Sequence, residues 1–501
     1  MDRPALAALT SLGLAFFACA HPAEGKPGPA QGKPASAPSS TNAPAPPAVP
    51  PPAADSVPGP LRFLAIGGGP TPESTEVSLE QDIDLVRQAL PAPGVVLFAG
   101  GSGSESVREL DPSAKGDPVR LALGDLLAPR AGRQSRYRPA RFAAERATLD
   151  NVEARLSTAL AQAGGPLTVY IAAHGEQGQE ARRNSVALWG GNSLEVAHFA
   201  ELHERQHRAL RLVATSCFSG GFAELAFARA DERGRHPSSV PRCGLFAGTW
   251  DRETSGCDPN PDRRAQESYG LHFAHALSGT RKDGSPLPLT LADYDHDGKV
   301  GLLDAHTWAR IAAVSFDVPT TTSERWLRSA EPGSAPIDKS LLPEDAAVIE
   351  RLGSALGLTS EQGVLESWTK LDEKLERLND DIDQVEGALA RTEAEETTLL
   401  LESWPMLDDP FHPDFESTFQ QNRGAIEKLL TNSPQALTRA QAIERARLLY
   451  DEVGRVGVQE ARVLRVKRAY ETLHKASALL KKGGPAAKYY AALLACERGA
   501  P

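Results

Sequence analysis

The sequence predicts an α/β fold, with a mostly parallel sheet and helices on both faces, followed by an all-α C-terminal region. From residue 61 onward, apolar segments of strand length alternate with segments whose apolar residues recur every three or four positions, as in amphipathic helices. Two strand-like segments, 167–173 and 210–214, lead into glycine-containing turns. Between residues 364 and 389, apolar residues step by four and three without interruption, which is typical of a coiled-coil seam.

Residues 1–20 are predicted to form an export signal. Arg3 precedes a short apolar stretch that is too short to anchor stably in a bilayer. The end of this stretch fits an ordinary cleavage site after Ala20, and it also resembles the lipobox of bacterial lipoproteins, in which Cys19 is acylated. We favour lipidation of Cys19, because a long tether follows it. The protein is therefore expected to be exported, either as an outer-membrane lipoprotein anchored through Cys19 or as a periplasmic or secreted protein.

Residues 21–60 are predicted to be a disordered linker, because they consist mostly of Pro, Ala, Gly and Ser. The whole chain of 501 residues is 41% hydrophobic and 24% charged, which suits two or three globular domains. Its net charge of -11, together with the lack of a basic block in the sequence, argues against nucleic acid as a partner.

The α/β domain is expected to span residues 61–335. Apolar runs predict its strands, and apolar residues at helical spacing predict the helices between them. In chain order we expect strands at 61–69, 94–101, 167–173, 185–189, 210–214 and 243–250, and helices at 78–90, 143–163, 193–206 and 303–313. The glycines at 67–69 lack the Gly-x-Gly-x-x-Gly spacing of a dinucleotide-binding loop, so no such cofactor is expected.

Two of the predicted strands are followed by residues with reactive side chains. The strand 167–173 runs into His174 and Gly175, and the strand 210–214 is followed by Cys217. Because adjacent parallel strands end at the same edge of a sheet, His174 and Cys217 are expected side by side. Histidine can activate a thiol as a nucleophile, and the backbone N–H groups of Gly175 and Cys217 can stabilise an oxyanion. We therefore predict a catalytic His174–Cys217 dyad, with the amides of Gly175 and Cys217 as the oxyanion hole.

The order strand-His-Gly and then strand-Ser-Cys-Phe-Ser-Gly-Gly resembles the caspase-fold (clan CD) cysteine peptidases, which include caspases, metacaspases and legumains. The resemblance covers roughly residues 61–335. It implies a caspase-like three-layer sandwich, a peptide or protein substrate and no cofactor for catalysis. It also implies that Cys217 is the nucleophile and His174 the general base and acid.

The residue preferred before the cleaved bond is not given by the resemblance. Legumains hold asparagine with an arginine and a glutamate, where this chain has Ser78 and Thr215, so asparaginyl specificity is not expected. Acidic residues near the expected pocket favour a basic substrate side chain by charge complementarity. These residues are Glu73, Glu76, Asp251 and Glu253.

Cys243 and Cys257 are candidates for a disulfide across a short loop, since disulfides persist in exported proteins. A disulfide of this kind adds about 3 kcal/mol to the free energy of unfolding. The alternative, two free thiols, stays open, because Cys243 opens a predicted buried strand.

Residues 293–304 resemble the calcium loop of EF-hands and dockerins. Asp293, Asp295 and Asp297 stand at loop positions one, three and five, Lys299 at seven and Asp304 at twelve, with a glycine at six for the sharp turn. These five residues are the candidate metal ligands. The expected cofactor is a structural calcium ion, with a solvated Asp-Gly turn as the alternative.

Residues 341–501 are predicted to be helical. After the seam at 364–389 and a proline-containing break at 404–413, apolar spacing predicts helices at 436–453 and 458–482. The simplest arrangement is an antiparallel bundle that packs on itself or on the α/β domain. The alternative is that these helices bind a protein partner or a second copy of the chain.

Taken together, these patterns predict an exported, membrane-tethered cysteine endopeptidase with a helical C-terminal domain. Two alternatives remain open. The first is a catalytically silent caspase-like scaffold whose helices bind a partner. The second is a transpeptidase that uses the same dyad to join peptide chains.

Overall fold

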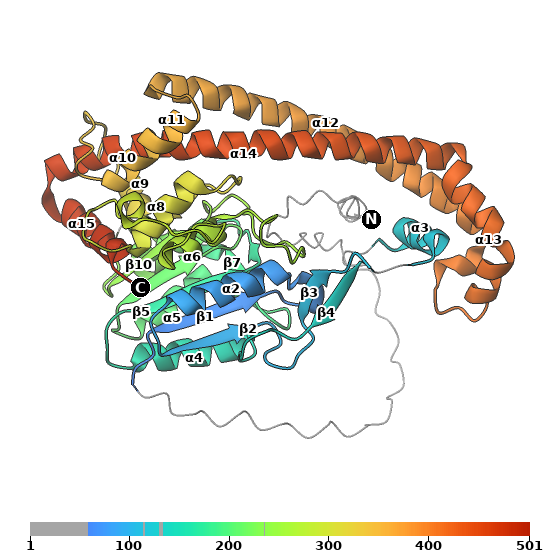
Figure 1. Cartoon of the computed structure of the whole chain (residues 1–501), viewed down its shortest axis with the longest axis horizontal. Coiled ribbons are helices and arrows are strands. Elements are labelled where there is room, and N and C mark those ends of the chain that lie inside the picture. Colours follow the sequence, from blue (N-terminus) through green and yellow to red (C-terminus); the bar gives the residue numbers. More distant parts are fainter. Residues whose placement is uncertain (1–58, 114–115, 130–133, 235) are drawn as a thin grey trace.

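The computed structural model describes residues 59–113, 116–129, 134–234 and 236–501 (Figure 1). The predicted signal (1–20), Cys19 and all but the last two residues of the predicted linker therefore lie outside the described residues. An α/β part comes first, and a helical part follows from residue 343. Among the described helices, none combines the length and the apolar character that crossing a bilayer requires.

A six-stranded sheet forms the centre of the α/β part. Its strands are β1 (Phe63–Gly68), β2 (Gly94–Phe98), β5 (Leu167–Ala173), β9 (Leu210–Ala214), β10 (Arg242–Phe246) and β11 (Thr320–Thr321). They lie in the order β11-β10-β9-β5-β1-β2, and all neighbours are parallel except β10 and β11. The predicted mostly parallel sheet is confirmed.

Helices cover both faces of this sheet (Figure 1). Successive strand residues point to opposite faces, so each strand contributes to two separate cores. On one face, Ala65 and Tyr170 pack with α2 (Val77–Ala89), α6 (Tyr269–Leu277) and α8 (Leu302–Ala312). On the other face, Leu64 and Val169 pack with α4 (Leu149–Ala161) and α5 (Val196–Glu204). Near-continuous apolar strands are what burial on both faces requires.

Smaller elements lie at the strand ends. They are the two-stranded sheet of β3 (Val107–Leu110) and β4 (Ser135–Arg138), helix α3 (Pro118–Leu127), the three-stranded sheet of β6 (Gly175–Glu176), β7 (Ser185–Ala187) and β8 (Ser193–Glu195), and helices α7 (Leu289–Ala292) and α9 (Thr322–Ser329). Short 3₁₀ turns are η2 (Pro72–Ser74), η3 (Ala181–Arg183), η4 (Ser219–Ala226), η5 (Ala228–Ala230) and η6 (Glu232–Gly234).

The expected helix 193–206 begins late, because Leu194 first pairs with Val186 in β7. The segment after Cys217 that has helical spacing forms the 3₁₀ turn η4 rather than an α-helix.

The helical part contains α10 (Pro343–Ala347), the π-helical turn η7 (Val348–Leu352), α11 (Gly353–Ala355), α12 (Glu361–Ser403), the 3₁₀ turn η8 (Pro405–Asp408), α13 (Phe415–Asn432), α14 (Pro434–Lys482) and α15 (Gly484–Arg498). We call α12 and α14 together the hairpin, since these long helices lie side by side (Figure 1). The predicted seam on α12 packs within the chain, with Ile382, Val385 and Leu389 buried. The two helices expected at 436–453 and 458–482 are one continuous helix, α14.

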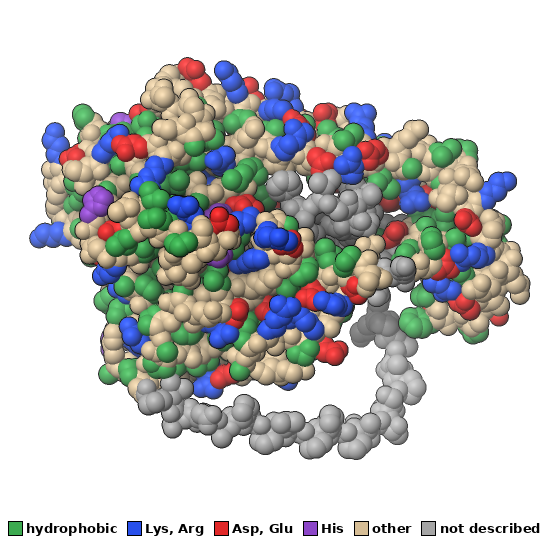
Figure 2. All heavy atoms as spheres, in the orientation of Figure 1, with side chains coloured by type: hydrophobic (Ala, Val, Ile, Leu, Met, Phe, Trp, Pro, Cys, Tyr) green, Lys and Arg blue, Asp and Glu red, His purple; other side chains and the backbone are tan. Residues whose placement is uncertain are grey.

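The helical part is attached to the α/β part at two places. Near the sheet, Val463 and Val466 of α14 and Tyr490 of α15 share a core with Trp326 of α9. At the other end of the hairpin, α3 packs against α13 (Figure 1). On the face in Figure 2, basic and acidic side chains are interspersed over both parts, which is typical of a solvated surface.

A disulfide joins Cys243 of β10 to Cys496 of α15, with a Cα–Cα distance of 6.0 Å. The expected Cys243–Cys257 disulfide is therefore wrong, and so is the alternative of a free Cys243. The physical reason is that α15 packs along β10 and brings Cys496 to the sheet, a contact between residues 253 positions apart. Cys217 is the free cysteine of the described residues.

Candidate active site

His174 and Cys217 lie at the ends of neighbouring strands. In the parallel pairing of β5 and β9, the register ends with Ile171 opposite Ala214, three residues before His174 and Cys217. The backbones come so close that a Cβ on Gly175 would lie 1.9 Å from the carbonyl oxygen of Cys217. Only glycine fits there. Gly175 and Cys217 are thus in close backbone contact, while the side chains of His174 and Cys217 have separate hydrogen-bond partners.

The thiol of Cys217 is buried, with 1% of the residue exposed. Its Sγ accepts a hydrogen bond from the amide of Thr254 at 3.2 Å and lies 3.6 Å from the Thr254 carbonyl oxygen. Burial raises the pKa of the Cys217 thiol, although the Thr254 amide opposes this by stabilising the thiolate. Among the described residues, the hydrogen bonds of this sulfur go to Thr254 and not to His174.

The turn after Cys217 is held in a strained conformation. Phe218 has φ 57°, a left-handed value that bulky side chains rarely adopt. Its amide donates to the carbonyl oxygen of Arg252 at 2.8 Å, and its own carbonyl oxygen accepts from Nδ2 of Asn184 at 2.9 Å. Nδ2 of Asn184 also donates to the carbonyl oxygen of Trp250 at 2.7 Å. The turn is thus fixed by the loop that follows β10 and by a buried amide side chain.

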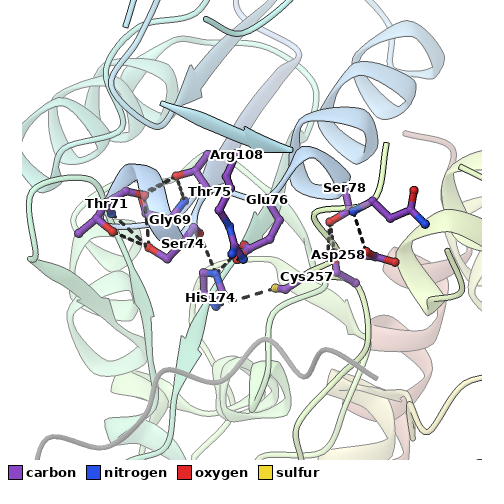
Figure 3. Close-up of polar contacts among 12 residues, drawn as sticks. Gly69, Thr71, Ser74, Thr75, Glu76, Ser78, Arg108, His174, Cys257 and Asp258 are labelled. Atoms are coloured by element: carbon purple, nitrogen blue, oxygen red, sulfur yellow. Dashed lines mark hydrogen bonds and ion pairs between the residues drawn. The ribbon is translucent and has the colours of Figure 1, made fainter. Parts of the chain in front are cut away.

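His174 is oriented by two oxygen atoms (Figure 3). Its Nε2 lies 2.8 Å from the carbonyl oxygen of Ser74 and 3.0 Å from Oε2 of Glu76. Two acceptors on Nε2 require that this nitrogen carries the proton, which leaves Nδ1 as the basic nitrogen of the neutral ring. Sγ of Cys257 lies 3.8 Å from Nδ1.

Glu76 is a buried carboxylate that also pairs with Arg108 at 2.7 Å. Burial alone would raise the pKa of Glu76, but the charge of His174, its hydrogen bond and the charge of Arg108 outweigh burial and lower the pKa to about 2. Glu76 therefore stays ionised and fixes the histidine ring. The sequence had suggested Glu76 only as an acidic residue near the substrate pocket, and Arg108 was not predicted as part of the site.

A cavity of about 260 Å³ lies beside this site. Ser255, Gly256 and Ser78 line its wall. In the sequence, Ser255 and Gly256 lie between Thr254 and Cys257. The remaining lining residues are Asp258, Arg263, Ala265, Gln266, Glu267, Ser268, Val314, Ser315 and Phe316. Its carboxylates are thus Asp258 and Glu267 rather than the four acidic residues suggested by the sequence.

The charges in the cavity are not all neutralised. Arg263 pairs with Asp82, and Glu267 binds His272 and Lys282 at 2.6 Å each. Asp258 accepts a hydrogen bond from the amide of Asn260 at 2.8 Å, and within the described part of the chain it forms no ion pair. Burial raises the pKa of Asp258. A cationic group that entered the cavity would compensate this carboxylate.

The 293–304 loop brings three of its five predicted ligands together. Carboxylate oxygens of Asp293, Asp295 and Asp297 lie within 4.8 Å of one another. The fourth carboxylate, Asp304, accepts hydrogen bonds from the amides of Tyr294 at 2.8 Å and Gly301 at 2.9 Å, and burial raises its pKa to about 6. The Nζ of Lys299 lies 3.3 Å from Asp297. Three clustered oxygen ligands on a tight loop fit a hard cation such as calcium.

A second group of metal-ligand types, Glu76, His174 and Cys257, also lies within 4.8 Å. Nε2 of His174 is already held by the Ser74 carbonyl oxygen and by Glu76, and Glu76 is paired with Arg108. The arrangement is therefore explained by the orientation of His174.

Comparison with models of known protein families and with curated protein sequences found no match. The features available are a thiol and a histidine on adjacent strand ends, an ionised carboxylate behind the histidine and a cavity beside both.

Proposed function

We propose that this chain is a cysteine endopeptidase of the caspase-like fold, in which Cys217 is the nucleophile and His174 is the base and acid. The observation that carries the proposal is the parallel pairing of β5 and β9, the two strands that His174 and Cys217 follow. A mostly parallel sheet with helices on both faces supports the caspase-like resemblance over residues 61–335. The Nε2 contacts of His174 also support it, because they make Nδ1 the basic nitrogen of the neutral ring.

In the proposed reaction, the Sγ of Cys217 transfers its proton to Nδ1 of His174 and attacks the carbonyl carbon of the scissile bond. The oxyanion that forms is stabilised by the amides of Gly175 and Cys217. His174 then gives its proton to the leaving nitrogen, and the C–N bond breaks to leave a thioester on Cys217. Water, deprotonated by His174, hydrolyses the thioester and regenerates the thiol.

The resting geometry adds one step to this scheme. The Cys217 thiol is bonded to Thr254, and burial raises its pKa, so it is protonated near neutral pH. Attack therefore requires the sulfur to leave Thr254 and turn toward His174. Substrate that enters the neighbouring cavity, whose wall includes Ser255, is the natural trigger.

The cavity extends the proposal to a substrate class. Asp258 is the lining carboxylate without an ion-pair partner among the described residues, and a lysine or arginine side chain is the complementary group. We therefore propose cleavage after a basic residue.

The test uses a mixed peptide library with mass-spectrometric identification of products, for the wild type and for Cys217→Ala, with and without calcium. Cleavage after Lys or Arg that disappears in the variant supports the proposal. Identical product patterns for both proteins would favour the silent scaffold. Ligated rather than hydrolysed peptides would favour the transpeptidase.

As part of the same proposal, the protein is exported and held at a membrane through acylated Cys19. The Cys243–Cys496 disulfide supports export, because disulfides persist mainly in oxidising compartments. Labelled palmitate should be incorporated into the wild type and not into Cys19→Ser. A wild-type protein without label, and with its N-terminus at His21, would instead indicate ordinary signal cleavage.

A further inference from the structure

We infer that the C-terminal hairpin is part of the active-site framework, and that Glu460 and Arg465 of α14 are positioning residues for Cys217. The inference rests on the proposed function, because it concerns how the nucleophile is held. It is carried by two buried contacts from α14, one to each side of the segment that surrounds the cysteine.

The first contact is a bidentate ion pair. Glu460 is 1% exposed, and its carboxylate accepts from Nη1 and Nη2 of Arg252 at 2.9 and 3.1 Å. The same carboxylate accepts from Nε1 of Trp368 on α12 at 2.9 Å. Two guanidinium bonds fix the direction as well as the distance of Arg252.

Arg252 also contacts the turn that directly follows Cys217. Its backbone carbonyl oxygen accepts from the amide of Phe218, the residue directly after Cys217. Two residues further on, the amide of Thr254 donates to Sγ of Cys217. Because both contacts come from one short segment, a shift of Arg252 moves the turn and the partner of the thiol together.

The second contact holds the other side of the same segment. Arg465 is 1% exposed and donates to the backbone carbonyl oxygens of Ala313, Ser315 and Asp317 at 2.7 Å each. The carboxylate of Asp317 in turn accepts from the amide of Ser255 at 2.6 Å. Ser255 and Ser315 both line the cavity, so α14 also supports the proposed substrate pocket.

These contacts are specific to one end of the hairpin. Toward its other end, α12 and α14 are joined by the buried Glu396, which pairs with Arg439 at 2.7 Å. This second pair resembles Glu460–Arg252 in charge and in the burial of its carboxylate, and it joins the two hairpin helices, with a further hydrogen bond from Arg439 to the carbonyl oxygen of Leu430 on α13 at 3.4 Å. It is therefore a matched control, because breaking either pair leaves a buried charge without its partner.

The test compares five full-length proteins: wild type, Arg252→Met, Glu460→Gln, the Arg252→Met/Glu460→Gln double variant, and the control Glu396→Gln. For each we would measure Tm, kcat and KM on a cleaved peptide, and the rate at which iodoacetamide alkylates Cys217. Each single variant of the pair should lower kcat/KM by about tenfold to a hundredfold, as expected when a reacting group is misplaced by about 1 Å. The double variant should be no worse than the poorer single variant, since the two residues act through each other.

Alkylation of Cys217 should become faster in Arg252→Met and Glu460→Gln well below Tm, because the segment that covers the thiol is released. Glu396→Gln should lower Tm to a similar extent and leave both alkylation and kcat/KM unchanged. Equal behaviour of Glu460→Gln and Glu396→Gln, or losses that simply add in the double variant, would overturn the inference. If Glu460→Gln does not fold, the result for Arg252→Met tests the inference. The Arg252 side chain is partly exposed, so its replacement disturbs the fold less.

The proposed peptidase activity and the positioning role of α14 are tested by different measurements. A wild type without Cys217-dependent cleavage would refute the peptidase, whereas the alkylation rates would still decide whether α14 positions the thiol.

Discussion

Glu76 links the histidine of the candidate site to a buried arginine, and its removal should reduce turnover. In Glu76→Gln, the amide holds the Nε2 proton of His174 less strongly and leaves Arg108 without its carboxylate. We expect kcat to fall by about tenfold to a hundredfold with little change in KM, as for other residues that orient a functional histidine. Steady-state kinetics on the library-derived peptide would check this. An unchanged kcat would mean that the Ser74 carbonyl oxygen orients the ring alone.

The same carboxylate should make stability depend on acid pH. The pKa of Glu76 is about 2 in the folded protein against its usual 4.5. A lowered pKa stabilises the fold above pH 4.5, by about 3 kcal/mol here, and this stabilisation is lost as the pH falls toward 2. In urea titrations, the difference in unfolding free energy between wild type and Glu76→Gln should be largest above pH 4.5 and shrink below it. A difference independent of pH would contradict the assignment.

Asp258 should set the preference for a basic substrate side chain. In Asp258→Asn, the cavity loses the carboxylate that lacks an ion-pair partner among the described residues, so kcat/KM for peptides with Lys or Arg should fall about a hundredfold. Asp251→Asn is the control, since Asp251 is exposed and its carboxylate accepts from the Thr249 hydroxyl. Competition between peptides that differ only in this residue would measure the change. A preference that survives Asp258→Asn would rule out this role.

Sequence patterns predict the candidate site residues that directly follow strands, but not those that other segments bring to the site. His174, Gly175 and Cys217 were predictable because strand ends and glycines are local signals. Thr254 and Asn184 carry no local signal, since their roles arise only when the loop after β10 and the segment after β6 fold over the cysteine turn. Cys243 was assigned to a nearby partner for the same reason.

Among the elements, the 293–304 loop offers a separate test. The carboxylates of Asp293, Asp295 and Asp297 repel one another, and burial together with the charge of Asp297 raises the pKa of Asp295. Calcium at about fifty times its dissociation constant would add about 2 kcal/mol, or several degrees in Tm. Calcium should therefore raise Tm, and EDTA should reverse the effect.

The control variants for calcium are Asp295→Asn, which should abolish the rise in Tm, and Asp283→Asn, which should keep it. Asp283 is exposed in a neighbouring turn and binds the Ser285 hydroxyl. A wild-type Tm that is the same with calcium and with EDTA would end the calcium hypothesis.

Helices whose apolar residues recur with one period along their whole length were predicted. Helices that bury different faces along their length were not. The α12 seam was predicted because its apolar residues keep one period along the contact with α14. Helix α14 buries Ala446 within the hairpin but Val463 and Val466 against the α/β part, so no single period describes it and it was divided in two. Helices α3 and α13 were not predicted. They pack against each other, although they lie far apart in the sequence.

For the whole molecule, the Cys243–Cys496 disulfide should be a major source of stability. It closes a loop of 253 residues, for which the chain-entropy estimate is about 5 kcal/mol. The Cys243→Ser/Cys496→Ser double variant, made with Cys217→Ala to prevent thiol exchange, should unfold at markedly lower urea concentration than Cys217→Ala alone. Identical midpoints would show that the α15 contacts suffice without the bond.

The Cys243–Cys496 disulfide also determines how the protein would behave after cleavage by a protease. Phe411, at the α13 end of the hairpin, is 92% exposed, in a turn that a foreign protease could reach. A cut there falls between Cys243 and Cys496, so the two fragments stay covalently joined. The nicked molecule would migrate as an intact chain until a reductant is added, and its C-terminal fragment, which carries Glu460 and Arg465, would not diffuse away.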